Sequence, residues 1–138
     1  TKFYYAPGFG PESKSFDLSG YEFEPQPTDR AEYVRNASKA GMFLSVSKYE
    51  SFGIYYLELL CSGAVGVFLD RPWVRELIPN YRYIVPAGEL LSCMAHVREN
   101  YDEASSYVCD FIPTIRKRFD LHAFANDLIN EIQILSKE

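Results

Sequence analysis

Two short apolar runs, residues 42–46 and 64–69, flank a segment whose apolar residues recur at helical spacing. Each run is too short for a typical helix and is bounded by turn-forming or charged residues, so each is predicted to be a strand. Strands that are apolar on both faces are typical of parallel sheets covered by helices. The alternation of strand and helix patterns therefore predicts an α/β fold with an open, mostly parallel sheet flanked by helices.

The other elements of the first two thirds of the chain follow from the same kinds of pattern. Thr28 and Asp29 are candidate N-caps of one helix, and Gly41 is its expected stop. Altogether we expect strands at residues 3–6 and 83–85, a weaker strand at 15–20, helices at 28–40 and 54–63, and a helical turn at 74–78.

From Gly88 onward the sequence predicts helices alone. The first has an apolar stripe, and the second is interrupted by Pro113, which we expect to end or kink it. The last helix follows Asp120, a candidate N-cap, and its wide apolar face needs a partner surface, either its own domain or a second copy of the chain in a homodimer. The three stripes are Leu90, Met94 and Val97; Ala104, Val108, Phe111, Ile112 and Ile115; and Leu121, Phe124, Ala125, Leu128, Ile129, Ile132 and Leu135.

Composition narrows the class of protein. The 138 residues are 47% hydrophobic, which indicates one globular domain. A net charge of −5 argues against a protein that coats nucleic acid, because such binding needs a basic face. No apolar run approaches the ~20 residues of a membrane span. Cys61, Cys93 and Cys109 follow no metal-ligand spacing, so we expect reduced thiols and a cytoplasmic protein.

The residues that indicate chemistry lie between the two buried-type strands, at residues 45–58. Gly53 lets the backbone turn tightly and approach a ligand, and the free N–H groups of the helix that follows suit a phosphate. Glu50 lies before that helix start and Glu58 about one turn into the helix. Carboxylates beside a phosphate site are suited to accept hydrogen bonds from sugar hydroxyls. The pattern therefore predicts a nucleotide-sugar site.

Residues 43–78 resemble the C-terminal, donor-binding domain of retaining glycosyltransferases of the GT-B type, in the family 4-like group. The family's Ser-x-x-Glu-Gly-Phe-Gly-x-x-x-x-Glu is similar to Ser47-Lys48-Tyr49-Glu50-Ser51-Phe52-Gly53 followed by Glu58. Four flanking motifs occur in the family's order: Gly8-Phe9-Gly10-Pro11, Leu18-Ser19-Gly20-Tyr21, Glu76-Leu77-Ile78 and Val85-Pro86-Ala87-Gly88.

The resemblance implies a Rossmann-like domain, one half of a GT-B fold, that binds a nucleoside-diphosphate sugar. It assigns Glu50 as the catalytic residue that contacts the transferred sugar, and Glu58 as the ligand of the ribose hydroxyls. No metal or other cofactor is implied, because the protein stabilises charge on the leaving phosphate. The donor-binding residues that it implies are Ser51, Phe52, Gly53, Ile54, Glu58, Gly20 and Tyr21.

Departures from the family pattern suggest a C-terminal fragment of a longer enzyme. The chain begins at Thr1 and lacks both the N-terminal acceptor domain and the family's Gly-Arg and Lys clamp on the diphosphate. We therefore expect residues 1–138 to form a single nucleotide-sugar-binding domain that is inactive alone. Arg71, Arg75 and Arg82 either replace the clamp or are ordinary surface residues, and Lys48 is either a phosphate ligand or an exposed loop residue.

Three alternatives stay open. One is that the chain is a non-catalytic binding or assembly module whose nucleotide-sugar site has decayed. Another is that it is a different GT-B enzyme, such as a sugar epimerase. The basic residues 116–118 either touch an anionic membrane, which would place the protein at the inner face of that membrane, or form a solvated helix end.

Overall fold

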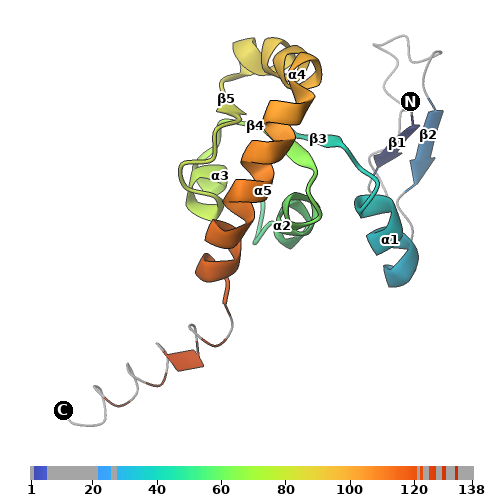
Figure 1. Ribbon diagram of the computed structural model, residues 1–138. Helices are drawn as coiled ribbons and strands as arrows, with labels where there is room; N and C mark the ends of the chain where they lie inside the picture. The colour runs from blue at the N-terminus through green and yellow to red at the C-terminus, as the bar shows by residue number, and fades with distance from the viewer. Residues whose placement is uncertain are drawn as a thin grey trace. The chain divides into compact units, whose positions relative to one another are not determined.

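The computed structural model describes residues 2–5, 22–25 and 28–120, together with residues 122, 125, 126, 129 and 133 (Figure 1). The chain divides into two compact units, Thr1–Ala37 and Ser38–Glu138. The predicted site lies mainly in the second unit.

The first unit contains two parallel strands and a helix. Strand β1 (Lys2–Tyr5) confirms the predicted strand, and it pairs with β2 (Glu22–Pro25), which the sequence patterns did not predict. Helix α1 (Arg30–Ala37) begins where the Asp29 carboxylate accepts a hydrogen bond of 2.8 Å from the Glu32 N–H, which confirms Asp29 as an N-cap. The helix ends three residues before the predicted position 40. The weaker strand candidate at 15–20 lies outside the described residues.

The second unit is built on a three-stranded parallel sheet in the order β3-β4-β5. Its strands are β3 (Met42–Ser45), β4 (Val65–Leu69) and β5 (Ile84–Val85), each close to its predicted position. All five residues of the central strand β4 are buried. The described part of the chain is therefore a mixed α/β structure with a small, open parallel sheet, as the strand and helix alternation predicts.

Strand β3 is less buried than predicted. It lies at one edge of the described sheet, where Leu44 is 40% exposed. Val46, just beyond the strand, is 55% exposed. Phe43, on the other face, packs edge to face on Phe68 of β4 with ring centroids 5.4 Å apart. The prediction of a fully buried strand is wrong in the described structure, because Leu44 is exposed at the edge of the sheet, although Met42 and Phe43 pack against the core.

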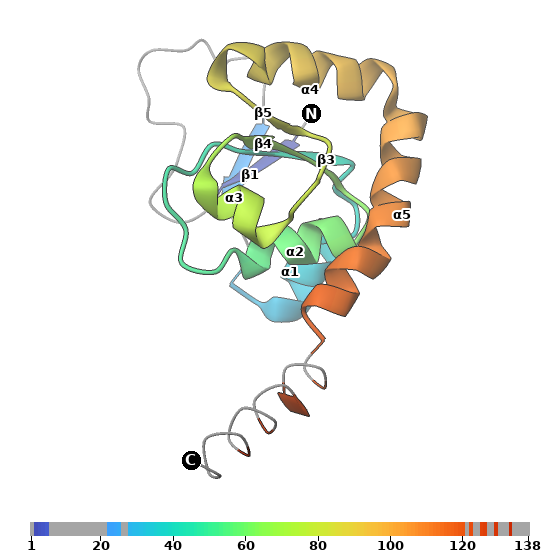
Figure 2. The same ribbon diagram turned by 90° about the vertical axis from the view of Figure 1, so that its left-hand side faces the viewer.

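In the described part of the second unit, five helices cover or frame the sheet. Figure 2 shows α4 and α5 meeting at a corner, so that they run along two sides of it. The core lies between β4 and the apolar faces of α2, α3, α4 and α5. The helices are α2 (Ile54–Cys61), α3 (Pro72–Leu77), the short 3-10 helix η1 (Ala87–Glu89), α4 (Leu90–Glu99) and α5 (Tyr101–Arg118).

Helix α5 continues through Pro113, so of the two predicted outcomes, an end or a kink, the end is wrong. A proline inside a helix removes the hydrogen bond to the carbonyl four residues earlier, here that of Cys109. Both Pro113 and Cys109 are exposed, so water can solvate the carbonyl. The opposite face keeps Ala104 and Ile115 buried in the core, which holds the helix together across the defect.

After α5, the carboxylate of Asp120 accepts a hydrogen bond of 2.8 Å from the His122 N–H, which confirms Asp120 as a cap. Residues 122, 125, 126, 129 and 133 are helical, and Ile129 is 51% exposed. Ala125, on the same predicted apolar face, is also exposed, and the remaining residues of that face lie outside the described residues. None of the helices in the described part combines the length and apolar character needed to cross a bilayer.

Candidate functional site

The loop between β3 and α2 lies at the carboxyl edge of the sheet. Strand β3 ends at Ser45, which pairs with Phe68 of the parallel strand β4, so the loops after both strands leave from the same edge. This is the edge at which open parallel sheets bind ligands. Glu50 and the Phe52-Gly53 turn therefore follow the carboxyl end of β3, which lies at an edge of the described sheet.

Gly53 begins helix α2 in a conformation that favours glycine. Its φ is 73°, in the left-handed region, and an added Cβ would lie only 2.8 Å from Cδ2 of Leu77. The carbonyl of Gly53 accepts hydrogen bonds from Tyr56 and Leu57, which close the first turn of the helix. Among the described residues, the N–H of Ile54 has no acceptor. The predicted helix start and its free amide are both present.

The carboxylate of Glu50 contacts its own loop. Its Oε1 atom accepts hydrogen bonds from the Ser51 backbone N–H at 2.9 Å and from the Ser51 hydroxyl at 3.4 Å. Both residues are exposed. The Phe52 side chain is 55% exposed and packs edge to face on Phe119, just after α5, with ring centroids 6.0 Å apart. The loop is thus accessible from solvent but is supported from the side by the end of α5.

Glu58 lies one turn after Ile54 on the same face of α2 and is partly buried. The predicted ribose ligand is therefore on the helix that begins at the glycine turn, as the motif requires. Gly20 and Tyr21, which the resemblance places beside the base, lie outside the described residues. Their roles stay predictions.

An aromatic cluster joins the loops that follow β3 and β4, and sequence reasoning did not predict it. The Trp73 indole N–H donates a hydrogen bond of 3.1 Å to the Ser47 carbonyl, and the Ser47 hydroxyl shares one of 2.9 Å with the Tyr56 hydroxyl. The Tyr56 and Trp73 rings stack with centroids 5.4 Å apart. Trp73, the one tryptophan of the sequence, was the available signal, but the sequence pattern does not indicate its partners.

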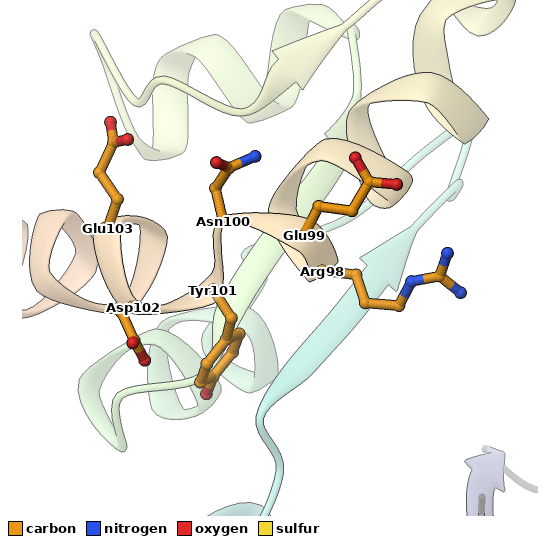
Figure 3. Close-up of a pocket in the computed structure, with 6 residues that line it drawn as sticks. All are labelled: Arg98, Glu99, Asn100, Tyr101, Asp102 and Glu103. Atoms are coloured by element: carbon orange, nitrogen blue, oxygen red, sulfur yellow. The ribbon is translucent and has the colours of Figure 1, made fainter.

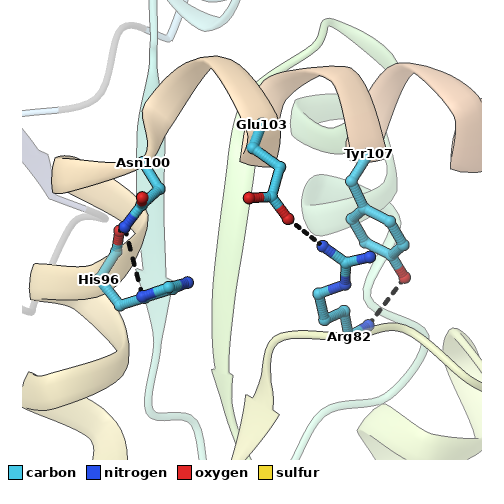
Figure 4. Close-up of polar contacts among 5 residues, drawn as sticks. All are labelled: Arg82, His96, Asn100, Glu103 and Tyr107. Atoms are coloured by element: carbon cyan, nitrogen blue, oxygen red, sulfur yellow. Dashed lines mark hydrogen bonds and ion pairs between the residues drawn. The ribbon is translucent and has the colours of Figure 1, made fainter.

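The three arginines considered as clamp residues have different surroundings. Arg75 forms a bidentate ion pair with Asp70, with both N–O distances 2.7 Å, and its hydrogen bonds hold the pKa of that carboxyl below its usual value. Arg82 pairs with Glu103 at 3.1 Å and covers the ring of Tyr107 at 4.3 Å (Figure 4). Arg71 differs, because its Nε is buried and donates to no described residue.

Lys48 is exposed and lies over the Tyr49 ring, with its Nζ 5.3 Å from the ring centroid. This position agrees with the simpler prediction of an exposed loop lysine, while a role in phosphate binding stays untested. Tyr49 itself is 81% exposed.

A shallow hollow lies elsewhere, where α4 meets α5, and is lined by residues 98–103. Figure 3 shows their side chains pointing away from one another rather than toward a common centre, so the hollow lacks the convergent polar groups of a binding site. Within the described residues, His, Cys, Asp and Glu side chains form no group of three that could hold a metal ion.

Comparisons with models of protein families, with curated proteins and with solved structures found no match to this chain. The function is therefore inferred from the residues at the carboxyl edge of the sheet and from the motif that they form.

Proposed function

We propose that the chain is the donor-binding domain of a glycosyltransferase that transfers a sugar from a nucleoside diphosphate with retention. The supporting observation is the Gly53 turn, which begins α2 at the carboxyl end of β3 between Glu50 and Glu58. A backbone with positive φ, a free amide at the helix start and two carboxylates at the motif's spacing are suited to a nucleotide-sugar. In this proposal the sheet is part of one Rossmann-like half of a GT-B fold.

Each part of the loop has a separate task in the proposed site. The N–H of Ile54, at the positive end of α2, donates to a donor phosphate, and the missing side chain at Gly53 lets that phosphate approach. Glu58 accepts hydrogen bonds from the two ribose hydroxyls. Glu50 accepts hydrogen bonds from the sugar, and when it turns away from Ser51 it releases the Ser51 N–H as a further donor. Donors aimed at the leaving phosphate stabilise the charge that develops there.

The proposal includes the rest of the enzyme. A longer chain would supply the N-terminal domain that binds the acceptor, and the present chain alone would bind the donor without transferring its sugar. We propose a cytoplasmic enzyme that needs no metal, and one whose basic α5 end can approach an anionic membrane surface.

Titration of the chain with UDP, GDP and ADP tests the proposal. At least one should bind, with a dissociation constant in the high micromolar to millimolar range, because this chain would supply only one side of the proposed site. Glu58→Ala should weaken that binding by about tenfold or more, since a hydrogen bond to a charged group contributes about 1.5–3 kcal/mol. Glu50→Ala should leave the free nucleotide's affinity nearly unchanged and weaken binding of the matching nucleotide-sugar.

Glu99→Ala, at the exposed end of α4, is the matched control. It should change neither the affinity for the free nucleotide nor the affinity for the nucleotide-sugar. Equal losses for both ligands in the Glu50 and Glu58 variants would contradict the division of roles. Absence of binding by all three nucleotides and their sugars would favour the alternative function, a binding or assembly module with a decayed site.

A further inference from the structure

A guanidinium nitrogen without an acceptor lies at the carboxyl edge of the sheet. Arg71 follows β4 with one residue between them and caps α3 in an extended conformation, with φ −142° and ψ 149°. Its Nε atom is buried and donates to no described residue. Arg71 as a whole is partly exposed, but a buried N–H is normally paired, because leaving it unpaired sacrifices its hydration without a replacement. The position is therefore one that an anionic ligand would complete.

No neighbouring carboxylate in the described structure accepts a hydrogen bond from the Arg71 Nε atom. Both carboxylate oxygens of Asp70 accept hydrogen bonds from Arg75, at 2.7 Å each. Arg71 is close enough to help lower the pKa of Asp70, but it forms no hydrogen bond with that carboxylate. Residues 70–75, with one aspartate and two arginines, carry a net charge of +1, and Glu76 follows them.

Two observations connect Arg71 with the loop of the proposed site. Trp73, two residues later, donates to the Ser47 carbonyl at 3.1 Å and stacks on Tyr56 of α2, so the two loops are held together. At the end of the neighbouring strand β3, Ser45 is 3% exposed and its hydroxyl also has no partner in the described structure. Ser45 at the end of β3 and Arg71 two residues after β4 thus each have a buried polar atom without a partner in the described structure, at the same edge of the sheet.

We propose that Arg71 binds the diphosphate of the nucleotide donor. This inference rests on the proposed function, and it adds the residue that neutralises the two phosphates. A guanidinium is suited to the task because it stays charged and presents a planar set of donors that fits phosphate oxygens. Arg75 and Arg82 do not take this role, since each is held in an ion pair.

The test compares three probes on the whole chain: the nucleoside diphosphate that binds best, its parent nucleoside, and inorganic pyrophosphate. Arg71→Gln should weaken the binding of the nucleoside diphosphate and of pyrophosphate by about tenfold or more, because each ligand loses a charge-assisted hydrogen bond. The nucleoside, which has no phosphate, should bind equally well to both proteins. Arg98→Gln removes an exposed arginine at the end of α4 and controls for net charge.

Two further measurements keep the test decisive if Arg71→Gln unfolds the chain. Arg71→Lys keeps the charge but loses the planar set of donors, so its affinity for pyrophosphate should lie between those of wild type and Arg71→Gln. In the wild-type protein, the NMR resonance of the Arg71 Nε–H should shift on addition of pyrophosphate. A resonance that stays unmoved at saturation would overturn the inference without the use of any variant.

The outcomes separate this inference from the proposed function. Nucleotide binding that is equal in wild type, Arg71→Gln and Arg98→Gln would overturn the role of Arg71 and leave the donor site standing. Pyrophosphate binding that depends on Arg71, without any nucleotide binding, would support the anion site and contradict the glycosyltransferase proposal. Failure of both ligands to bind wild type would overturn both.

Discussion

At the scale of single residues, Tyr81 performs a task that normally belongs to a strand. The backbone of Gly66 points toward β5, but β5 is so short that its ladder with β4 begins only at Phe68. The buried Tyr81 hydroxyl takes the place of the missing strand. It accepts a hydrogen bond of 3.2 Å from the Gly66 N–H and donates one of 2.9 Å to the Gly66 carbonyl.

Tyr81→Phe should therefore lower the free energy of unfolding by about 1–3 kcal/mol, because it leaves two buried backbone groups of Gly66 unsatisfied. Tyr101→Phe is the matched control. It removes one hydrogen bond to the Gly41 carbonyl from a tyrosine that is 38% exposed, and should cost about 0.5–1 kcal/mol. Denaturant unfolding measures both changes, and equal losses in the two variants would contradict the special role of Tyr81.

The same hydroxyl makes stability depend on alkaline pH. Burial raises the pKa of Tyr81 above its ordinary value of 10.0. The unfolded chain therefore loses this proton first, so the contribution of Tyr81 is complete below about pH 10 and declines as the pH rises further. Wild type should lose stability more steeply above that pH than Tyr81→Phe does.

Residue types and their spacing predicted part of the site, but not which side chains contact one another there. Gly53 and the start of α2 were predictable because a turn at the carboxyl end of a strand needs a residue that tolerates positive φ. The sequence could not separate Arg71 from Arg75 and Arg82, since the difference lies in which acceptors surround each guanidinium. The Ser47–Trp73 contact joins residues 26 positions apart and has no local signature.

At the scale of elements, local patterns predicted where strands and helices occur better than they predicted how buried each element is. Strand β4 is buried on both faces as its composition indicates, whereas β3, with a similar composition, lies at an edge of the described sheet. Strand order depends on contacts between distant segments, so composition alone could not separate the two. Strand β2 was missed because its four residues include two glutamates and a proline, which are depleted in strands.

Helix α5 allows a test of how packing overrides local preference. Pro113→Ala should restore an N–H that can bond the Cys109 carbonyl, and so raise the free energy of unfolding by about 1–3 kcal/mol. Thr114→Ala, an exposed neighbour in the same helix, should change stability by only about 0.5 kcal/mol. If thermal or denaturant unfolding showed no gain for Pro113→Ala, the backbone at this position would not be limiting stability.

At the scale of the whole molecule, the alternating patterns were enough to predict an α/β structure with a parallel sheet. The division into the units Thr1–Ala37 and Ser38–Glu138 was not predicted, because no composition shift marks position 38. The residues proposed to bind the diphosphate come from the loops after two strands of the second unit, so this part of the site depends on one sheet edge.

The central claim is that this edge binds a nucleoside diphosphate. The most direct test is a titration of the isotope-labelled chain followed by proton–nitrogen correlation spectra. The account predicts that the largest shifts will occur at the backbone amides of residues 51–54 and at the Arg71 Nε–H. Shifts confined to the hollow at residues 98–103, or no shifts at millimolar nucleotide, would contradict it.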